Sequence, residues 1–341
     1  MVRKVKKKKT GIRIFVAFLL MVVIAAFIYK SSITPGNQHI FKKEYDDKTS
    51  SYSSLKITPD SSEDRTTPVP PSKIETDPSV PISHDKLNSP NAILIRLKDH
   101  TILMQKNSEE KIYPASLTKM MTAIVAIENL SNLKEEIKLT NSTFQGLYGA
   151  DASMAGFLPG EQVKAIDLLY GVMLPSGAEC CIGLADQIAG SEQNFVKLMN
   201  QKAADLGMEN THFENATGLH NVNHYTTVKD LAILLSYALQ NDTFREIFTS
   251  SRHSAQPTNM HPDGITFNST MFELNNQNII DGEILGGKTG YTHEAGLCLA
   301  SLAKVGNQEY ILISAGAKGD HHSEQYDFTD ALTVYNSIGK R

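Results

Sequence analysis

The sequence predicts an α/β domain of the α+β type, in which strands from the two ends of the domain form one antiparallel sheet and the chain between them forms a helical subdomain. Two apolar stretches, 92–97 and 101–106, are separated by Lys-Asp-His, which predicts a hairpin. Two more, 296–305 and 308–317, flank a Gly-Asn turn and predict a second hairpin. Between the hairpins, apolar residues recur every three or four positions, as they do in helices.

The first predicted helix covers residues 113–130 and directly follows the first hairpin. Its apolar side chains recur at helical spacing, so it is expected to be amphipathic and to pack into the core. Pro114 and Ser116 are residue types that begin helices. Lys119 is the only charged residue among positions 112–127. An ammonium near the start of an otherwise apolar helix requires an explanation.

Further helices are predicted in the middle of the chain and at its end. Their segments carry apolar residues at three-four spacing, and they cover residues 165–175, 178–190, 191–207, 226–240 and 324–339. Thr227 and Asp230 have the spacing of a capping box at the start of the fourth of these segments. No internal repeat is present.

Composition places the chain among globular proteins, because 41% of its 341 residues are hydrophobic and 21% are charged. Residues 1–13 hold seven of the 33 basic residues and no acidic one, so the rest has 26 basic and 37 acidic residues and a formal charge of −11. An acidic body argues against a nucleic-acid partner. Cys180, Cys181 and Cys298 form no disulfide or zinc pattern and are expected to be small buried residues.

The first 85 residues are predicted to lie outside this domain. Residues 1–13 are expected to be a basic cytoplasmic tail, and residues 14–30 a transmembrane signal-anchor, because they are apolar up to position 29. A cleaved secretory signal is the alternative, although no clear small-x-small cleavage site follows. Residues 31–85, rich in Ser, Thr and Pro, are predicted to be a disordered linker. The domain at 86–341 is therefore expected on the extracellular side of the cell membrane, held by a single span.

Ser116 and Lys119 are three residues apart, so their side chains are neighbours on a helix. A serine hydroxyl is a weak nucleophile until a base removes its proton. A lysine becomes such a base when burial and nearby cations lower its pKa toward neutrality. The unexpected charge of the first helix is explained if Lys119 activates Ser116. A bare Ser-x-x-Lys pattern often arises by chance, so this interpretation depends on the rest of the chain.

Two later motifs complete a set. Ser176 begins the triplet Ser-Gly-Ala ahead of a predicted helix, and Lys288, Thr289 and Gly290 lead into the second hairpin. Ser-x-x-Lys, a Ser-containing triplet and Lys-Thr-Gly, in this order, are typical of penicillin-binding enzymes. With these motifs, and with stretches such as "ASMAGFLPGEQV" and "GGKTGYTHEAGLCL", residues 90–341 resemble the serine-type D-alanyl-D-alanine carboxypeptidases of peptidase family S11, the low-molecular-mass penicillin-binding proteins.

This resemblance implies the serine β-lactamase/penicillin-binding-protein fold, an antiparallel sheet flanked by helices with a helical subdomain. It implies hydrolysis of the terminal D-Ala-D-Ala bond of peptidoglycan pentapeptide stems through an acyl-enzyme, without metal or cofactor, and β-lactams as inhibitors. A second β-domain and a C-terminal amphipathic anchor, common in relatives, are not expected, and the N-terminal segment would replace that anchor. Some relatives serve glycopeptide resistance, so a VanD-type resistance role stands as a hypothesis beside ordinary wall maturation.

The resemblance also implies a catalytic role for each motif residue. Ser116 would be the acylated nucleophile, Lys119 the general base, and Ser176 the hydroxyl that relays a proton to the leaving D-alanine. The second motif usually ends in Asn, but here Ala178 stands at that position. Losing one transition-state donor can cost about 10²–10³ in rate, and neighbouring Glu179 is a candidate to compensate. The alternative function is therefore a catalytically weak protein that binds penicillin or muropeptides.

The third motif would bind the substrate. The resemblance implies that Lys288 and Thr289 hold its terminal carboxylate and that Gly290 leaves room for an extended peptide beside the strand. Backbone N–H groups of Ser116 and Tyr291 would form the oxyanion hole. A lysine and a hydroxyl suit a small anionic terminus, and a strand edge suits an extended peptide.

Three rival functions are disfavoured by sequence context. Residues 282–289 match the phosphate-loop pattern of nucleotide-binding proteins, but the segment before them is polar and the segment after them is predicted as strand rather than helix. His220 and His224, and the adjacent His321 and His322, lack the ligand pattern of a zinc peptidase and are expected in loops and caps. A β-lactamase is disfavoured because no acidic residue for fast deacylation is recognisable.

Overall fold

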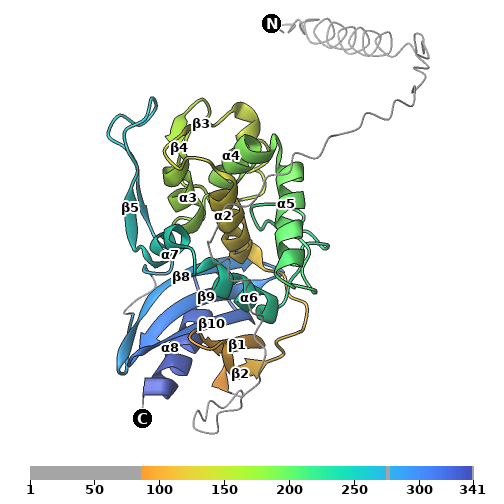
Figure 1. Cartoon of the computed structure of the whole chain (residues 1–341), viewed down its shortest axis with the longest axis vertical. Coiled ribbons are helices and arrows are strands. Elements are labelled where there is room, and N and C mark those ends of the chain that lie inside the picture. Colours follow the sequence, from red (N-terminus) through yellow and green to blue (C-terminus); the bar gives the residue numbers. More distant parts are fainter. Residues whose placement is uncertain (1–85, 274–276, 340–341) are drawn as a thin grey trace, which may run out of the picture. The chain divides into compact units, whose positions relative to one another are not determined.

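A six-stranded antiparallel sheet joins the two ends of the domain within residues 86–273 and 277–339, which the computed structural model describes (Figure 1). All neighbouring strands are antiparallel. Their order is β2 (Thr101–Lys106), β1 (Asn91–Arg96), β10 (Gln308–Ala317), β9 (Gly296–Val305), β8 (Gly282–Thr292) and β7 (Asn278–Ile279). Both predicted hairpins and the sheet built from the two ends are confirmed.

The chain between β2 and β7 forms helices and two small hairpins. The helices are η2 (Ala115–Leu117), α2 (Thr118–Asn129), η3 (Asn141–Phe144), α3 (Ala165–Met173), α4 (Ala178–Ala189), α5 (Glu192–Asp205), α6 (Val228–Ala238) and α7 (Asp242–Thr249), and α8 (Tyr326–Gly339) follows the sheet. The hairpins pair β3 (Glu136–Lys138) with β4 (Gln162–Lys164), and β5 (Arg252–Ser254) with β6 (Thr266–Asn268). Figure 1 shows α3, α4, β3 and β4 gathered away from the sheet.

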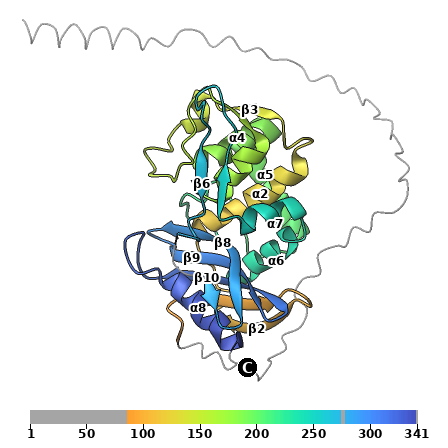
Figure 2. The same cartoon turned by 90° about the vertical axis from the view of Figure 1, so that its left-hand side faces the viewer.

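Both faces of the sheet are covered, because side chains alternate between the faces along each strand. Leu94 of β1 and Leu312 of β10 belong to a core that includes Tyr335 of α8. Ile93 and Ile313, one residue along, face the larger core of the helical subdomain. Figure 2 shows α8 on one side of the sheet and α6 and α7 on the other. The central strands are therefore apolar on both faces, which explains their near-continuous apolar sequences.

The helix α2 lies at the centre of the helical subdomain. Every residue of Thr118–Ala126 is buried, because α3, α4, α5, α6 and α7 all contact this helix. The prediction of an amphipathic helix is therefore wrong for this part, which is a core helix enclosed on all sides. Lys119, only 2% exposed, lies inside this core.

The other predicted helices form as expected, with two differences. α7 and the short strands β3 to β7 were not predicted, because they are too short for periodicity to reveal. Thr227 caps α6 by accepting the N–H of Asp230, and the three cysteines are buried and free, as predicted. Within the described ranges, no helix is long and apolar enough to span a membrane. The predicted tail, anchor and linker (1–85) lie outside the described residues.

Candidate active site

Ser116 and Lys119 meet at the point where η2 leads into α2. The ammonium nitrogen Nζ of Lys119 lies 3.0 Å from Oγ of Ser116 and 2.5 Å from the carbonyl oxygen of Thr217. Ser116 is half-buried and lines the cleft, whereas Lys119 is almost fully buried beneath it. The structure thus brings the predicted nucleophile and base into direct contact.

Burial determines the charge of Lys119. It lowers the pKa of the ammonium below its usual value, because the charged form loses its hydration, while electrostatic interactions with Cys181, Glu179 and Cys180 act in the opposite direction. Burial also raises the pKa of Cys181 to about 12 and that of Cys180 well above its usual value, so both thiols are neutral near pH 7 and do not oppose the effect of burial on Lys119 there. A lysine in this setting can exist as the neutral amine that general-base catalysis requires.

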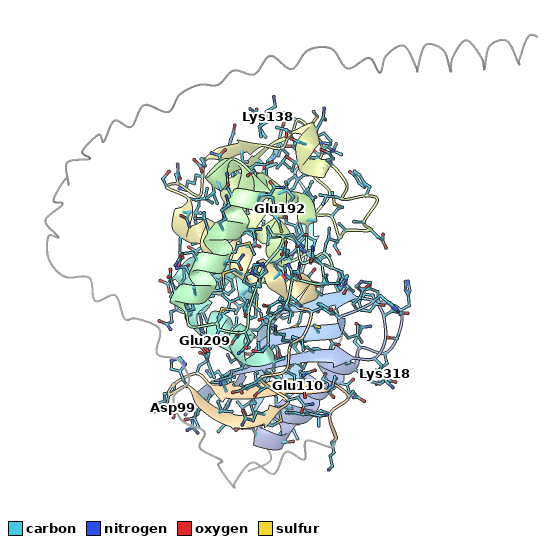
Figure 3. The ribbon with its side chains drawn as sticks, turned by 90° about the vertical axis from the view of Figure 1, so that its right-hand side faces the viewer. Asp99, Glu110, Lys138, Glu192, Glu209 and Lys318 are labelled. Atoms are coloured by element: carbon cyan, nitrogen blue, oxygen red, sulfur yellow. The ribbon has the colours of Figure 1, made fainter. Side chains whose placement is uncertain are left out.

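The loop that presents the Thr217 carbonyl is pressed against the start of η2. Gly218 has a φ of +81°, and a Cβ there would lie 2.0 Å from the carbonyl oxygen of Ala115, so only glycine fits. Oδ1 of Asn215 accepts the N–H groups of Thr217 and Gly218 at 3.2 Å and 2.7 Å. Figure 3 labels Glu192 on α5, whose Oε1 accepts the N–H of neighbouring Ala216 at 2.9 Å. The carbonyl that binds Lys119 is therefore held from several sides.

The strand β8 passes directly beside Ser116. A Cβ on Gly290 would lie 3.1 Å from the backbone nitrogen of Ser116 and 3.3 Å from that of Leu117. The glycine therefore lets the strand approach the nucleophile, whereas we expected it to leave room for substrate. β7 pairs only with Gly282 and Glu283. Beyond that pair, no other described strand covers this edge of β8, which leaves it open to an extended peptide.

Thr289 and Lys288 take different positions around the cleft. Thr289 lines it, and its hydroxyl lies 2.7 Å from that of Thr270. Lys288 is fully buried and its Nζ donates to the carbonyl of Thr289 at 2.9 Å. Burial, reinforced by Lys119, lowers the pKa of Lys288 well below its usual value. Lys288 thus lies behind the cleft wall, whereas we expected it to contact substrate directly.

Ser176 lies in the turn between α3 and α4 with an unusual backbone and an unusual side chain. Its φ is +66°, in the region that favours glycine, and the residue is only 5% exposed. Among the described residues its hydroxyl has no hydrogen-bond partner, yet the residue lines the cleft together with Ser116 and Thr289. Strained backbone and unpaired buried polar atoms cluster at functional sites.

Ala178 and Glu179 begin α4. Ala178 is fully buried at the cleft wall, and its N–H donates to the carbonyl of Ser153 at 2.8 Å. Oε1 of Glu179 accepts the N–H groups of Ala155 and Gly156 at 2.7 Å and 2.9 Å. Glu179 is therefore bound to a backbone turn through Oε1, and an ionised carboxylate cannot supply the N–H donors of the missing amide.

The cleft has two halves, each of about 310 Å³, that meet at Ser116, Ser153, Tyr291 and His321. The first half, which we call the acyl half, is lined by Lys119, Ala178, Thr217, His220 and Glu294, among others. The second, which we call the leaving-group half, is lined by Ser176, Thr270, Glu273, Thr289 and Asp327, among others. The nucleophile therefore lies at the junction of two compartments.

The rival motifs do not form rival sites. Residues 282–289 lie inside β8 and no helix follows them, so they cannot form a phosphate loop. Within the described ranges, no group of three His, Cys, Asp or Glu side chains could hold a metal ion. His224 lies in a loop, as predicted, but it is buried there, and its Nε2 lies 2.8 Å from Oγ1 of Thr118. Because the N–H of Glu214 donates to Nδ1 at 3.2 Å, the proton of His224 is on Nε2.

Comparison with known proteins agrees with this geometry. The family model of the D-alanyl-D-alanine carboxypeptidases of peptidase family S11 matches residues 76–319. The chain belongs to this family. Its relatives include D-alanyl-D-alanine carboxypeptidase DacF of Bacillus subtilis, 36% identical over 235 residues, and DacC of Escherichia coli, 35% identical over 241 residues. Each match covers 67% of this chain and 57% and 56% of the relative, so the chain spans a little over half of their length.

Solved structures show the same fold. The DD-transpeptidase of Streptomyces K15 is similar with a TM-score of 0.67 and 26% identity, over 75% of this chain and 98% of that one. A D-alanyl-D-alanine carboxypeptidase of Mycobacterium tuberculosis has a TM-score of 0.66 at 24% identity, over 78% and 96% of the two chains. The predicted penicillin-binding-protein fold, with an antiparallel sheet and helices, is therefore confirmed.

The sequence did not reveal every residue of the site. The carbonyl of Thr217 binds Lys119, but a backbone group leaves no signature in its own side chain. The sequence signal for this loop is a polar turn ahead of helix α6, which contains Asn215 and Gly218, the two residues that hold the loop in place. Asp327 has the position of an ordinary acidic residue in the first turn of a helix, and only the packing of α8 brings it to the cleft.

Proposed function

We propose that this chain is a serine D,D-carboxypeptidase that hydrolyses the terminal D-Ala-D-Ala bond of peptidoglycan pentapeptide stems. The observation that carries the proposal is the contact of 3.0 Å between Oγ of Ser116 and Nζ of a buried Lys119. Family membership supports it, because the family is named for this activity. The same serine would be acylated by β-lactams, which makes them inhibitors.

In the acylation step, neutral Lys119 takes the proton of Ser116 as Oγ attacks the carbonyl of the penultimate D-alanine. Backbone N–H groups of Ser116 and Tyr291 stabilise the oxyanion. The proton then passes from Lys119 through the hydroxyl of Ser176 to the leaving nitrogen, and free D-alanine departs. A water, deprotonated by Lys119, hydrolyses the ester and restores Ser116.

The substrate lies along the open edge of β8 in this proposal. Its stem peptide occupies the acyl half, and its C-terminal D-alanine occupies the leaving-group half. The Thr289 hydroxyl binds the terminal carboxylate directly, whereas Lys288 supports it from behind the wall by orienting the Thr289 backbone. The unpaired hydroxyl of Ser176 gains a partner when the leaving nitrogen arrives.

The test is D-alanine release from diacetyl-Lys-D-Ala-D-Ala by the purified chain, with Ser116→Ala as the control. Release that depends on Ser116 supports the proposal. A folded wild-type protein that releases no D-alanine contradicts it. Measuring the lifetime of the penicillin acyl-enzyme beside it separates a hydrolase, which clears the ester, from a binding protein, which retains it.

Ala178, which stands where the family usually has Asn, favours a second candidate function. In this second function the protein is weakly catalytic and binds penicillin or muropeptides. Glu179 does not replace the amide that the family usually has there, since its Oε1 accepts the N–H of Ala155. If the missing donor limits turnover, Ala178→Asn shortens the acyl-enzyme lifetime. An unchanged lifetime in Ala178→Asn removes the argument for this candidate.

We further propose that the chain is held in the cell membrane by residues 14–30, with its catalytic domain outside and the linker at 31–85 between them. The sequence of these segments supports this arrangement. Fractionation of cells that express the full chain, with protease added to intact spheroplasts, tests it. A protein recovered in the soluble fraction contradicts the anchor.

Two physiological roles fit the same chemistry, and we propose ordinary wall maturation as the first and VanD-type glycopeptide resistance as the second. Removing the terminal D-alanine limits cross-linking and also destroys the target of glycopeptides. Expression that lowers cellular pentapeptide content and also raises the vancomycin tolerance of a sensitive host supports the resistance role. Lowered pentapeptide without a change in tolerance leaves wall maturation alone.

A further inference from the structure

The leaving-group half of the cleft has to hold a carboxylate without a basic side chain in its wall. In the proposed function this half takes the C-terminal D-alanine, whose carboxylate is bound by Thr289. Neither lysine nor arginine is among the described residues that line it, whereas Glu273 and Asp327 are. The nearby ammonium of Lys288 donates to the carbonyl of Thr289 instead. The carboxylate therefore depends on neutral hydrogen-bond donors that point at it.

Thr270 supplies a second hydroxyl at this place. Its Oγ1 lies 2.7 Å from Oγ1 of Thr289, and both residues line the leaving-group half. A threonine hydroxyl has one hydrogen, so a contact between two hydroxyls uses only one of their two hydrogens. Among the described residues, neither hydroxyl has another hydrogen-bond partner. The pair therefore keeps one donor for a ligand, and it offers two donors when a ligand replaces the contact between the hydroxyls.

The backbone at Thr270 is fixed between the second and third motifs. The N–H of Thr270 donates at 3.2 Å to the carbonyl of Leu174, which lies two residues before Ser176. The next residue, Met271, is fully buried, and a Cβ on Gly287 would lie only 3.1 Å from its Cγ. The segment is thus packed closely against β8. The hydroxyl of Thr270 is therefore in place before substrate arrives, which lowers the entropy cost of binding.

Other side-chain donors that line this half alone are engaged elsewhere. Oγ of Ser323 and Nε2 of Gln325 both donate to the carbonyl of Asp320, each at 3.0 Å. In the proposed reaction, the hydroxyl of Ser176 serves the leaving nitrogen. The hydroxyls of the two threonines therefore remain for the carboxylate.

We propose that Thr270 is a second ligand of the terminal carboxylate of the substrate, so that the hydroxyls of Thr270 and Thr289 each donate to one of its oxygens. This inference rests on the proposed function, because it assumes that the leaving D-alanine occupies this half. When the carboxylate enters, one hydrogen bond between neutral groups is exchanged for two bonds to an anion, which are the stronger kind. Thr270 thus favours leaving groups that end in a carboxylate.

The contact is expected to affect only substrates that carry the carboxylate. Loss of one hydrogen bond to a charged group corresponds to a fall of about 10- to 100-fold in kcat/KM. A peptide that ends in D-alaninol has a CH₂OH group instead of the carboxylate, so it lacks this charge-assisted bond. A general disturbance of the site would lower kcat/KM for both peptides. The ratio of kcat/KM for the acid to that for the alcohol therefore reports the contact itself.

The experiment measures this acid-to-alcohol ratio for the full chain with diacetyl-Lys-D-Ala-D-Ala and diacetyl-Lys-D-Ala-D-alaninol. Thr270→Val removes the hydroxyl and keeps the shape of the side chain, whereas Thr270→Ser keeps the hydroxyl. Thr266→Val is the matched control. Its Oγ1 also contacts a hydroxyl, Oγ of Ser254 at 2.9 Å, but Thr266 is exposed on β6 and does not line the cleft.

Thr270→Val is expected to lower the ratio about 10- to 100-fold, whereas Thr270→Ser and Thr266→Val stay close to wild type. An unchanged ratio in Thr270→Val, or an equal fall for the two peptides, overturns the proposal. Adding Thr270→Val to Thr289→Val separates direct binding from an effect through Thr289. A further fall in the ratio supports direct contact, and no further fall overturns it.

Failure of the proposed function would give a different result, namely no release from either peptide by wild type. In that case the specificity is measured as the rate of Ser116 acylation by benzylpenicillin and by its methyl ester, which lacks the charged carboxylate. Thr270→Val is expected to lower the acid-to-ester ratio by the same factor of about 10 to 100. An unchanged ratio, or a wild-type protein that neither compound acylates, overturns the role of Thr270.

Discussion

Gly218→Ala tests how the catalytic lysine is held. A Cβ at this position would lie 2.0 Å from the carbonyl oxygen of Ala115, whereas such contacts essentially never fall below 3.0 Å. The loop and the start of η2 must therefore separate by about 1 Å, which moves the Thr217 carbonyl relative to Lys119. Misplacement of about 1 Å can cost about 10²-fold in rate. We expect kcat/KM for D-alanine release, and the rate of penicillin acylation, to fall by about this factor.

Gly207→Ala is the matched control for this prediction. Gly207 has a φ of +73°, close to the +81° of Gly218, but a Cβ there would meet nothing within 4 Å. Both variants lose about 1–2 kcal/mol of stability from the left-handed backbone, and only Gly218→Ala carries the clash. Thermal unfolding and both rates are measured for each protein. Equal activity of the two variants would refute the claim that this loop positions Lys119.

Three further predictions follow from buried groups. Ser176→Ala should lower the rate of Ser116 acylation. The melting temperature should stay level or rise, since the lost hydroxyl has no hydrogen-bond partner among the described residues. A large fall in melting temperature would contradict this prediction. The three cysteines, all buried and free, should react with a thiol reagent only after unfolding, and labelling of the native protein would contradict their burial. Burial raises the pKa of Asp327 from 3.8 to about 6, so protonation of this side chain stabilises the folded state at low pH. About 3 kcal/mol of that stabilisation is lost as the pH rises from 3.8 to about 6. Urea unfolding of Asp327→Asn should lack this loss, and parallel pH curves for the two proteins would contradict it.

Local features of the site could be predicted from the sequence. The contact between Ser116 and Lys119 follows from a spacing of three on a helix, and the single charge in an apolar segment marked it. The family resemblance that the three motifs carry implied that β8 and the α3–α4 turn meet at that helix. The sheet was predicted because its hairpins are long and its turns are short.

Features that depend on tertiary packing could not be predicted. Lys288 belongs to a recognisable motif, but only the fold shows that its ammonium lies behind the cleft wall. His224 lies in a loop, as predicted, but only the fold shows that it is buried against Thr118. Burial lowers its pKa to about 4 and keeps it neutral. Asp327 acquires its position from α8 packing on β9, a contact between residues that the sequence does not link.

The central claim is that a neutral, buried Lys119 activates Ser116. The most direct measurement is the pH dependence of Ser116 acylation by benzylpenicillin, followed by intact mass and peptide mapping, in wild type and in Lys119→Arg. The account predicts a label on Ser116, a rate that rises with pH and levels off below the ordinary lysine pKa of 10.5, and loss of acylation in the variant. Acylation of folded Lys119→Arg at the wild-type rate, or a label on another residue, would contradict it.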